Sequence, residues 1–243
     1  MDYIDQNKGS YELEYNGGWG NRYPDTRLIS YYYNKIRPLM MTEKAGFESV
    51  GKTEMNRGGG CILEFGCSIG ANLTFFHDIG YEVYGVDISE AAINKCVLNK
   101  GFKRENFKAV NILEKGKSIN EIFDVTFDLI IAPDVLYYFG NSDIKRVVHQ
   151  FYEVAKPGAV FYASMITYNS DTYRQYLSSS SDEENLTLVS RTGSVTEALY
   201  VNIMKDDEQV RQLCSEFKTK YILHTMTELD SMNEAIHYIG RKE

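Results

Sequence analysis

The stretch that most constrains the fold is CILEFGCSIGANL, residues 61–73. It begins as an apolar run that ends in a carboxylate at Glu64, continues through Gly66 and Gly70, and then takes the residue spacing of a helix. In open α/β sheets, a strand that turns sharply into a helix forms a ligand site at the carboxyl ends of the strands. We therefore predict a strand, a tight glycine turn and a helix arranged around a small ligand.

Apolar runs alternate with helical patterns over residues 59–165, which is typical of a parallel sheet with crossover helices. The run at 127–132 is almost unbroken, as expected for a strand that is buried on both faces. Ser89 suits a helix N-cap, and Gly80 and Gly101 suit helix ends. We predict strands at residues 61–65, 81–86, 107–110, 127–132 and 159–166, the last after a break at 156–158.

The flanking segments differ from this alternating core. Residues 24–38 suggest a separate N-terminal helix, and residues 168–202 are polar and serine-rich, so we expect an irregular excursion or flap there. Residues 206–217 have helical spacing, and residues 221–226 and 235–240 predict an antiparallel hairpin. The expected organisation is one domain, with a lid and helix at 1–58, a cofactor-binding core at 59–166, a substrate-side excursion and helix at 167–220, and a closing hairpin at 221–243.

Charge and composition argue against several classes of protein. The net charge is −8 and the basic residues are scattered, so no nucleic-acid partner is expected. No apolar run approaches the length of a membrane span and the N-terminal residues lack a secretory pattern, so we expect a cytoplasmic protein, monomeric or homodimeric. The four cysteines show no metal-ligand spacing, and we expect them to be reduced and structural, with no metal.

The chemistry of the glycine turn distinguishes two kinds of ligand. Gly66, Ser68 and Ala71 can be aligned with the dinucleotide pattern G-x-G-x-x-G/A, and Asp87 follows at the distance that suits a ribose diol. Glu64, however, would repel a pyrophosphate and attract a cation. S-adenosylmethionine carries an ammonium, a sulfonium and a ribose, so the electrostatics favour it.

Four segments resemble the motifs of class I S-adenosylmethionine-dependent methyltransferases, of the bacterial small-molecule type. They are ILEFGCSIGANL, VYGVDIS, FKAVNIL and FDLIIAPDVLYYF, and their order and spacing match the family from about residue 59 to 165. The closing hairpin resembles the family's last two strands. The resemblance implies a doubly wound, mostly parallel seven-stranded α/β sheet in the order 3-2-1-4-5-7-6, with an antiparallel last strand, helices on both faces and an N-terminal helical cap.

The resemblance also implies which residues hold the cofactor. Glu64, Gly66 and Gly70 would line its methionine end, and Asp87 would bind the ribose hydroxyls. The remaining implied contacts are Cys67, Ser68 and Asn72 at the turn, Ile88, Asn111 and Ile112 around the adenine, and Pro133 and Asp134 near the methionine ammonium. Ser68 replaces the more usual glycine of the motif, a departure that the family tolerates.

Plainer interpretations of these residues stay open. Gly66 and Gly70 could form nothing more than a tight turn between a strand and a helix. Asp87 alone could be a solvated loop residue, and Asn111 could be a turn residue.

Methyl transfer from a sulfonium is an in-line displacement, so the protein contributes mainly alignment and exclusion of water. A general base is needed only for a weakly acidic hydroxyl or a protonated amine. Candidate catalytic residues follow the fourth and fifth strands: Asp134, Tyr137, Tyr138 and Tyr168. For each tyrosine the alternative is simple packing.

Residues 17–27, GGWGNRYPDTR, support a separate hypothesis. Trp19, Arg22 and Tyr23 lie in a glycine-containing loop before a helix, and similar segments precede the core in methyltransferases that the chain resembles. We expect either a lid over the cofactor, with Arg22 available to the methionine carboxylate, or a surface loop in which Trp19 and Tyr23 attach the helix to the core.

The predicted function is methyl transfer from S-adenosylmethionine to a small molecule, leaving S-adenosylhomocysteine. The absence of an N/D-P-P-Y motif and the acidic character of the chain favour an oxygen on a sugar, glycan precursor or other metabolite over an amine. Arg191 could hold an acidic acceptor. The alternatives are a non-catalytic cofactor-binding partner subunit and, with less support, an NAD-dependent dehydrogenase using Tyr152 and Lys156.

Overall fold

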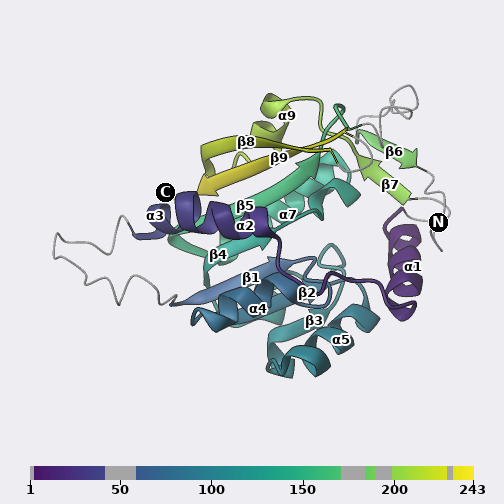
Figure 1. Cartoon of the computed structure of the whole chain (residues 1–243), viewed down its shortest axis with the longest axis vertical. Helices are drawn as coiled ribbons and strands as arrows, with labels where there is room; N and C mark the ends of the chain where they lie inside the picture. Colours follow the sequence, from purple (N-terminus) through teal and green to yellow (C-terminus); the bar gives the residue numbers. More distant parts are fainter. Residues whose placement is uncertain (1–2, 42–58, 171–183, 190–198, 229–231) are drawn as a thin grey trace.

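The computed structural model describes residues 3–41, 59–170, 184–189, 199–228 and 232–243. Within these residues, the apolar runs of the sequence pair into a seven-stranded sheet in the order β3-β2-β1-β4-β5-β9-β8. Helices cover both faces of this sheet (Figure 1). Its strands are β1 Cys61–Phe65, β2 Glu82–Asp87, β3 Phe107–Ala109, β4 Phe127–Ala132, β5 Ala155–Ile166, β8 Lys218–Glu228 and β9 Met232–Arg241.

The pairing of the strands confirms the predicted topology. β1 pairs in parallel with β2 and β4, and β4 pairs in parallel with β5. β9 runs antiparallel to β5, and β8 runs antiparallel to β9, so these two strands stand sixth and seventh in the order 3-2-1-4-5-7-6. Because β1, β2 and β4 run in parallel, their carboxyl ends meet at one edge of the sheet, where open α/β folds place their ligands.

Two apolar clusters hold helices against the two faces of the sheet. On one face, Leu73 and Phe76 of α4 pack in the same cluster as Ile62 of β1 and Ile131 of β4. On the other face, α6, α7 and α9 contribute to a second cluster. The described helices are α1 Tyr3–Asn16, α2 Thr26–Tyr31, η1 Tyr32–Ile36, α3 Arg37–Met41, α4 Ala71–Asp78, α5 Glu90–Lys100, η3 Arg104–Asn106, α6 Ile119–Ile122, η4 Leu136–Tyr138, α7 Asn141–Val154 and α9 Asp207–Leu213.

Local sequence explains the helices of the core. The side chain of Ser89 accepts a hydrogen bond from the N–H of Ala92 at 3.1 Å, which caps α5, and Gly101 ends that helix with φ at +68°. In α7, the aligned apolar side chains are all buried: Ile144, Val147, Val148, Phe151 and Val154. The helical spacing of the sequence therefore determined which face of each helix meets the sheet.

The start of the fifth strand was predicted wrongly. Residues 156–158 were expected to separate a helix from a strand, but β5 already begins at Ala155 and contains them. Phe127 pairs with Ala155 and Leu129 pairs with Val160, so the extra residues bulge out of the ladder. Proline and glycine fit such a bulge because it leaves backbone groups outside the ladder.

Two helical segments also have different limits from those expected. The N-terminal helix does not end at Pro38, because a π-turn at η1, in which Arg37 N–H donates to Tyr32 O, carries the chain into α3. At the other end of the chain, α9 stops at Leu213, and Phe217 lies just before β8. The four aligned apolar positions of residues 206–217 are nevertheless buried: Val210, Leu213, Cys214 and Phe217.

α1 and a second, two-stranded sheet were not predicted. α1 is polar and contains Gly9, so its sequence carries little helix signal. β6 Leu186–Val189 and β7 Leu199–Asn202 form an antiparallel pair within the segment that was expected to be irregular. In Figure 1, α1 and this pair lie at the same end of the molecule.

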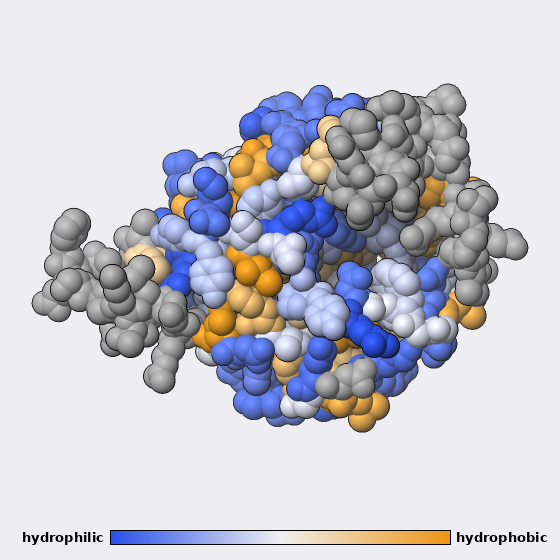
Figure 2. All heavy atoms as spheres, viewed as in Figure 1, coloured by the Kyte–Doolittle hydropathy of each residue, from blue (hydrophilic) through white to orange (hydrophobic). Residues whose placement is uncertain are grey.

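Most of the face drawn in Figure 2 is hydrophilic, with separate hydrophobic patches. Single exposed apolar side chains such as Leu98, which is 81% exposed, are normal on protein surfaces. In the part of the chain that the structure describes, every helix is too short or too polar to cross a membrane.

Phe151 of α7 provides a test of this packing. It is fully buried, and its ring lies 5.4 Å from the rings of Phe65 and Phe161. We expect Phe151→Ala to lower the free energy of unfolding by roughly 3–5 kcal/mol, because it leaves a cavity between helix and sheet. Urea denaturation measures the change, and Leu98→Ala, at an exposed position, should change it by less than about 0.5 kcal/mol.

Candidate active site

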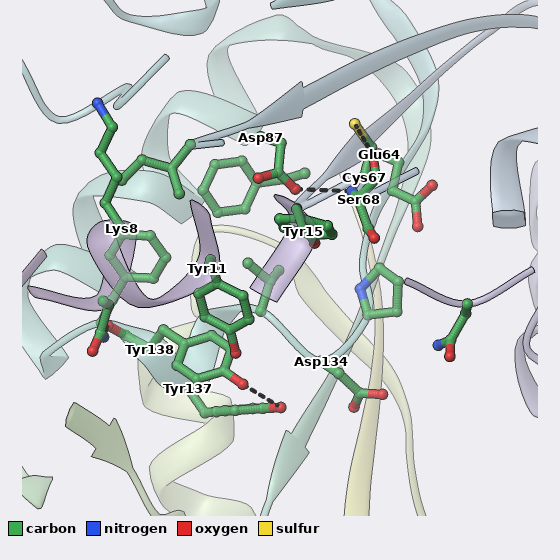
Figure 3. A pocket seen from close by; sticks show the side chains of 18 of the residues that line it. Lys8, Tyr11, Tyr15, Glu64, Cys67, Ser68, Asp87, Asp134, Tyr137 and Tyr138 are labelled. Carbon is green, nitrogen blue, oxygen red and sulfur yellow. Dashed lines mark hydrogen bonds between the residues drawn. The ribbon is translucent and has the colours of Figure 1, made fainter. Parts of the chain in front are cut away.

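A cavity of about 450 Å³ lies at the carboxyl edge of β1, β2 and β4 (Figure 3). Arg22, Gly70 and Tyr168 are not part of its described lining, and Arg191 falls outside the described residues. The other residues predicted from the sequence line it together: Trp19, Tyr23, Glu64, Gly66, Cys67, Ser68, Asn72, Asp87, Ile88, Asn111, Ile112, Pro133, Asp134, Tyr137 and Tyr138.

Glu64 is a buried carboxyl at the end of β1, with 2% of its surface exposed. Its Oε1 accepts a hydrogen bond from Asn72 Nδ2 at 2.7 Å, whereas Oε2 has no hydrogen-bond partner among the described residues. Desolvation raises the pKa of Glu64 from 4.5 to about 8; the hydrogen bond from Asn72 opposes this rise and Asp87 adds to it. A buried carboxyl with one unsatisfied oxygen is suited to a cation or a hydrogen-bond donor.

Three residues between β1 and α4 have a left-handed backbone: Gly66, Ser68 and Gly70. Gly66 has φ at +73°, and a Cβ there would lie 2.6 Å from Val135. Ser68 also has a positive φ, +50°, which explains why glycine is usual at this position of the motif. The N–H of Ser68 donates to Asp87 Oδ2 at 2.8 Å, and this bond holds the serine in its unfavourable conformation (Figure 3).

Asp87 links the glycine turn to the next helix. Its Oδ1 accepts a hydrogen bond from the N–H of Ser89 at 3.0 Å, and its side chain is 7% exposed, so it is not a solvated loop residue. Desolvation raises the pKa of Asp87 to about 6 in spite of the backbone hydrogen bonds that lower it. Asn111 has two roles: it lines the cavity, and its Oδ1 accepts from Leu113 N–H in a turn.

Asp134 follows β4 and lines the cavity. Its backbone is left-handed, with φ at +53°, and its N–H donates to Ser164 Oγ at 2.9 Å. Ser164 Oγ in turn donates to Asp134 Oδ1 at 2.7 Å. Partial desolvation raises the pKa of Asp134, while Ser164 and the charge of Arg27 lower it. The neighbouring strand β5 therefore fixes the direction of this carboxyl.

The start of α2 and the residue before it contribute Arg27 and Asp25 to the cavity, whereas Arg22 is exposed and is not part of the described lining. Arg27 forms an ion pair with Asp25 at 3.0 Å, and the N–H of Asp25 donates to Asn72 Oδ1 at 2.9 Å. Through Asn72 this segment is connected to Glu64. Arg27 and Asp25 were not predicted from the sequence, although Asp25-Thr26 carries the pattern of a helix N-cap.

α1 is the most important element of the site that was not predicted from the sequence, because one of its faces covers the cavity. Tyr11 and Tyr15, one turn apart, line it, and Tyr15 is 4% exposed. Asn7 exchanges two hydrogen bonds with the backbone of Tyr200, and Glu12 accepts hydrogen bonds from the first turn of α5. The i, i+4 spacing of Tyr11 and Tyr15 was the available signal, and it was too short to define a helix.

Four other residues singled out from the sequence are not part of the described cavity lining: Gly70, Tyr152, Lys156 and Tyr168. Tyr168 packs beside β6 and β7, and its hydroxyl lies 3.5 Å from Asn185 Oδ1. Gly70 starts α4 with φ at +79°, where a Cβ would lie 2.5 Å from Cys96 Sγ, so it allows close packing beneath the turn. Neither Tyr152 nor Lys156 lines the described cavity, which removes the support for a dehydrogenase.

A doubly wound sheet with a glycine turn after β1 and buried carboxyls after β1 and β2 defines a Rossmann-like nucleotide-cofactor site. A family described as a methyltransferase domain matches residues 39–220 of the sequence. An uncharacterized methyltransferase of Schizosaccharomyces pombe is 27% identical over 116 residues, which cover 47% of this chain and 78% of that protein.

Solved structures share the fold. An S-adenosylmethionine-dependent methyltransferase from Methanosarcina mazei superposes with a TM-score of 0.61 at 18% identity, covering 80% of this chain and 99% of that chain. The 1,6-didemethyltoxoflavin-N1-methyltransferase of Burkholderia thailandensis, with bound 1,6-didemethyltoxoflavin and S-adenosylhomocysteine, superposes with a TM-score of 0.60 at 14% identity. The match covers 99% of this chain and 89% of that chain. The N-methyltransferase NodS of Bradyrhizobium japonicum, in complex with S-adenosylhomocysteine, superposes with a TM-score of 0.58 at 14% identity. The match covers 96% of this chain and 98% of that chain.

The chain belongs to the methyltransferase domain family. The predicted class I S-adenosylmethionine-dependent enzyme and its cofactor are thereby confirmed. The residues present fit this cofactor, because the unsatisfied Oε2 of Glu64 suits a cationic group and the left-handed turn at Gly66 leaves room for close approach of a ligand.

The raised pKa of Glu64 predicts how stability depends on pH. Between about pH 4.5 and pH 8 the unfolded chain has released a proton that folded Glu64 retains, so the cofactor-free protein should lose stability as the pH rises, by up to roughly 4 kcal/mol. Glu64→Gln should remove this part of the loss. Urea midpoints at about pH 5.5 and 8.5 measure it, and equal losses in wild type and Glu64→Gln would contradict the buried-carboxyl account.

Proposed function

We propose that this protein transfers a methyl group from S-adenosylmethionine to an oxygen atom of a small-molecule acceptor. The observation that supports it is the arrangement of the cavity lining: Tyr11, Tyr137 and Tyr138 lie together on one side, away from the carboxyls of Glu64 and Asp87 (Figure 3). When bound, S-adenosylmethionine supplies an electrophilic methyl group. The acceptor oxygen forms the new C–O bond as the C–S bond breaks, the electron pair stays on sulfur, and the acceptor's proton leaves.

The carboxyl end of the cavity would hold the cofactor. Glu64 would bind the ammonium group through Oε2, because that oxygen has no partner among the described residues. Asp87 would accept hydrogen bonds from the ribose hydroxyls, since its two backbone bonds leave lone pairs available. Ile88 and Ile112 would contact the adenine, with Asn111 beside them.

The acceptor end offers few groups that could take a proton. No histidine lines the described part of the cavity. The hydroxyls of Tyr137 and Tyr138 lie 3.3 Å apart, so each can orient the other toward an acceptor hydroxyl. Asp134 lies just after β4, as the two tyrosines do, and its raised pKa suits a general base. We assign Asp134 this role and the tyrosines a positioning role.

An amine acceptor is the second candidate, because two of the structural neighbours are N-methyltransferases. The oxygen is favoured because Pro133-Asp134 stands where amino-group enzymes of this fold class often carry N/D-P-P-Y. Incubating the protein with methyl-labelled cofactor and a metabolite extract, followed by mass spectrometry, decides between them. A labelled N-methyl product would overturn the oxygen assignment, and cofactor binding without any labelled product would favour a non-catalytic partner subunit.

The ribose assignment makes a quantitative prediction. Asp87→Asn should weaken S-adenosylmethionine binding by about 10- to 100-fold, because charge-assisted hydrogen bonds contribute roughly 1.5–3 kcal/mol. Isothermal titration calorimetry measures the dissociation constant. Asp78→Asn, an exposed carboxyl at the end of α4, is the matched control and should bind as wild type does. Unchanged affinity in Asp87→Asn would refute the assignment.

The segment at residues 17–27 is proposed as a lid, with Arg27 rather than Arg22 facing the methionine carboxylate. Trp19 and Tyr23 line the cavity and are 42% and 81% exposed, so a bound cofactor could cover them further. We expect Trp19→Ala and Arg27→Ala each to weaken cofactor binding at least fivefold, and Arg22→Ala to leave it within twofold. Calorimetry tests all three, and the lid is abandoned if Trp19→Ala and Arg27→Ala bind normally.

A further inference from the structure

The acceptor end of the cavity has an unusual surface for an enzyme that binds a polar metabolite. We call it the aromatic end and define it by six residues from three separate elements. Tyr137 and Tyr138 come from η4, Tyr11 comes from α1, and the β6–β7 pair supplies Val189, Leu199 and Val201. Figure 3 shows Tyr11, Tyr137 and Tyr138 together on one side of the pocket, away from Glu64.

The rings of the aromatic end lie close enough to form one surface. The ring centroids of Tyr11 and Tyr138 are 5.2 Å apart with an interplanar angle of 75°, and those of Tyr137 and Tyr138 are 4.4 Å apart. Tyr137 packs with Val189 and Leu199 in one apolar cluster. The aromatic end therefore combines tyrosine rings with aliphatic side chains that pack against them.

We propose that the methyl acceptor is a planar aromatic compound, held at the aromatic end with its hydroxyl directed toward the cofactor. This rests on the proposed methyl transfer. A flat ring gains from burial of apolar area and from edge-to-face or offset contacts with tyrosine rings. A sugar has hydroxyls on every side, and those facing Val189, Leu199 and Val201 would lose water without gaining a partner from these side chains. The aromatic end thus selects against the sugar or glycan precursor that the sequence suggested.

Charge separates this proposal from a cationic ligand, which aromatic rings also attract. Lys8 lies one turn before Tyr11 on α1 and lines the same cavity. Its exposed ammonium adds positive charge on the side of Tyr11, which disfavours a cationic acceptor. Glu64 and Asp87 are the carboxyls proposed to hold the cofactor, and Asp25 is paired with Arg27. Asp134, the remaining carboxyl of the described lining, is the proposed base for the acceptor hydroxyl.

Binding of a simple aromatic alcohol tests the proposal. The protein is first saturated with S-adenosylhomocysteine, and calorimetry then compares 2-naphthol with its saturated analogue, decahydro-2-naphthol. We expect 2-naphthol to bind at least tenfold more tightly than the saturated analogue, and 2-naphthylmethylammonium to bind more weakly than 2-naphthol. Equal binding of the saturated analogue, tighter binding of the ammonium compound, or no binding of 2-naphthol would overturn the proposal.

Variants show whether the aromatic end carries this selectivity. Tyr11→Leu and Tyr138→Leu keep apolar volume but remove a ring, and each should weaken 2-naphthol binding about fivefold. Tyr33→Leu, at a ring that is 43% exposed on η1, should have no effect. Each variant must retain S-adenosylhomocysteine binding within twofold, which confirms its fold. Unchanged 2-naphthol binding in both variants would refute the aromatic site. If the wild type itself did not bind the cofactor, the proposed function would be refuted instead, so the two failures are distinguishable.

Discussion

The constraint on which the site depends is the burial of the Glu64 carboxyl on a central strand of the sheet. β1 is paired on both sides, so its backbone is fixed within the sheet, and Glu64 on it is 2% exposed. Asn72 satisfies one of its oxygens and leaves the other without a partner among the described residues. Burial of an unpaired carboxylate opposes folding, and a cationic ligand offsets that cost. The cofactor-free protein is therefore less stable at neutral pH than it would be without this buried carboxyl. We expect binding of the methyl donor to restore the lost stability.

The two halves of the cavity come from different parts of the architecture. The carboxyl end of the cavity, proposed to hold the cofactor, is built on the ends of β1, β2 and β4, where strand pairing fixes the backbone within the sheet. The aromatic end is built from α1, η4 and the β6–β7 pair, which are attached around the sheet edge and held by contacts such as those of Asn7 with Tyr200. A shared core architecture combined with different added walls is how one fold serves many acceptors.

The accuracy of the sequence-based predictions follows this division. The strands, the glycine turn and Asp87 were predicted because buried parallel strands are continuous apolar runs and because left-handed turns favour glycine. Ser68 was a departure that only the structure explains, since the hydrogen bond from its N–H to Asp87 holds it in a left-handed conformation. α1 was missed because its helix is polar and is stabilised by contacts with distant elements. Arg22 was named and Arg27 was missed because sequence cannot show which side of a short segment faces a cavity.

The sequence by itself determined where the strands of the seven-stranded sheet lie along the chain, the glycine turn after β1, and the two carboxyls at the ends of β1 and β2. These depend on local patterns, namely apolar runs, glycine positions and residue spacing. Only the tertiary structure decided which walls complete the cavity. Tyr11 and Tyr138 are 127 positions apart in the chain, and their rings meet because α1 docks over the sheet edge. Such long-range contacts depend on packing of the whole domain, which no local pattern encodes.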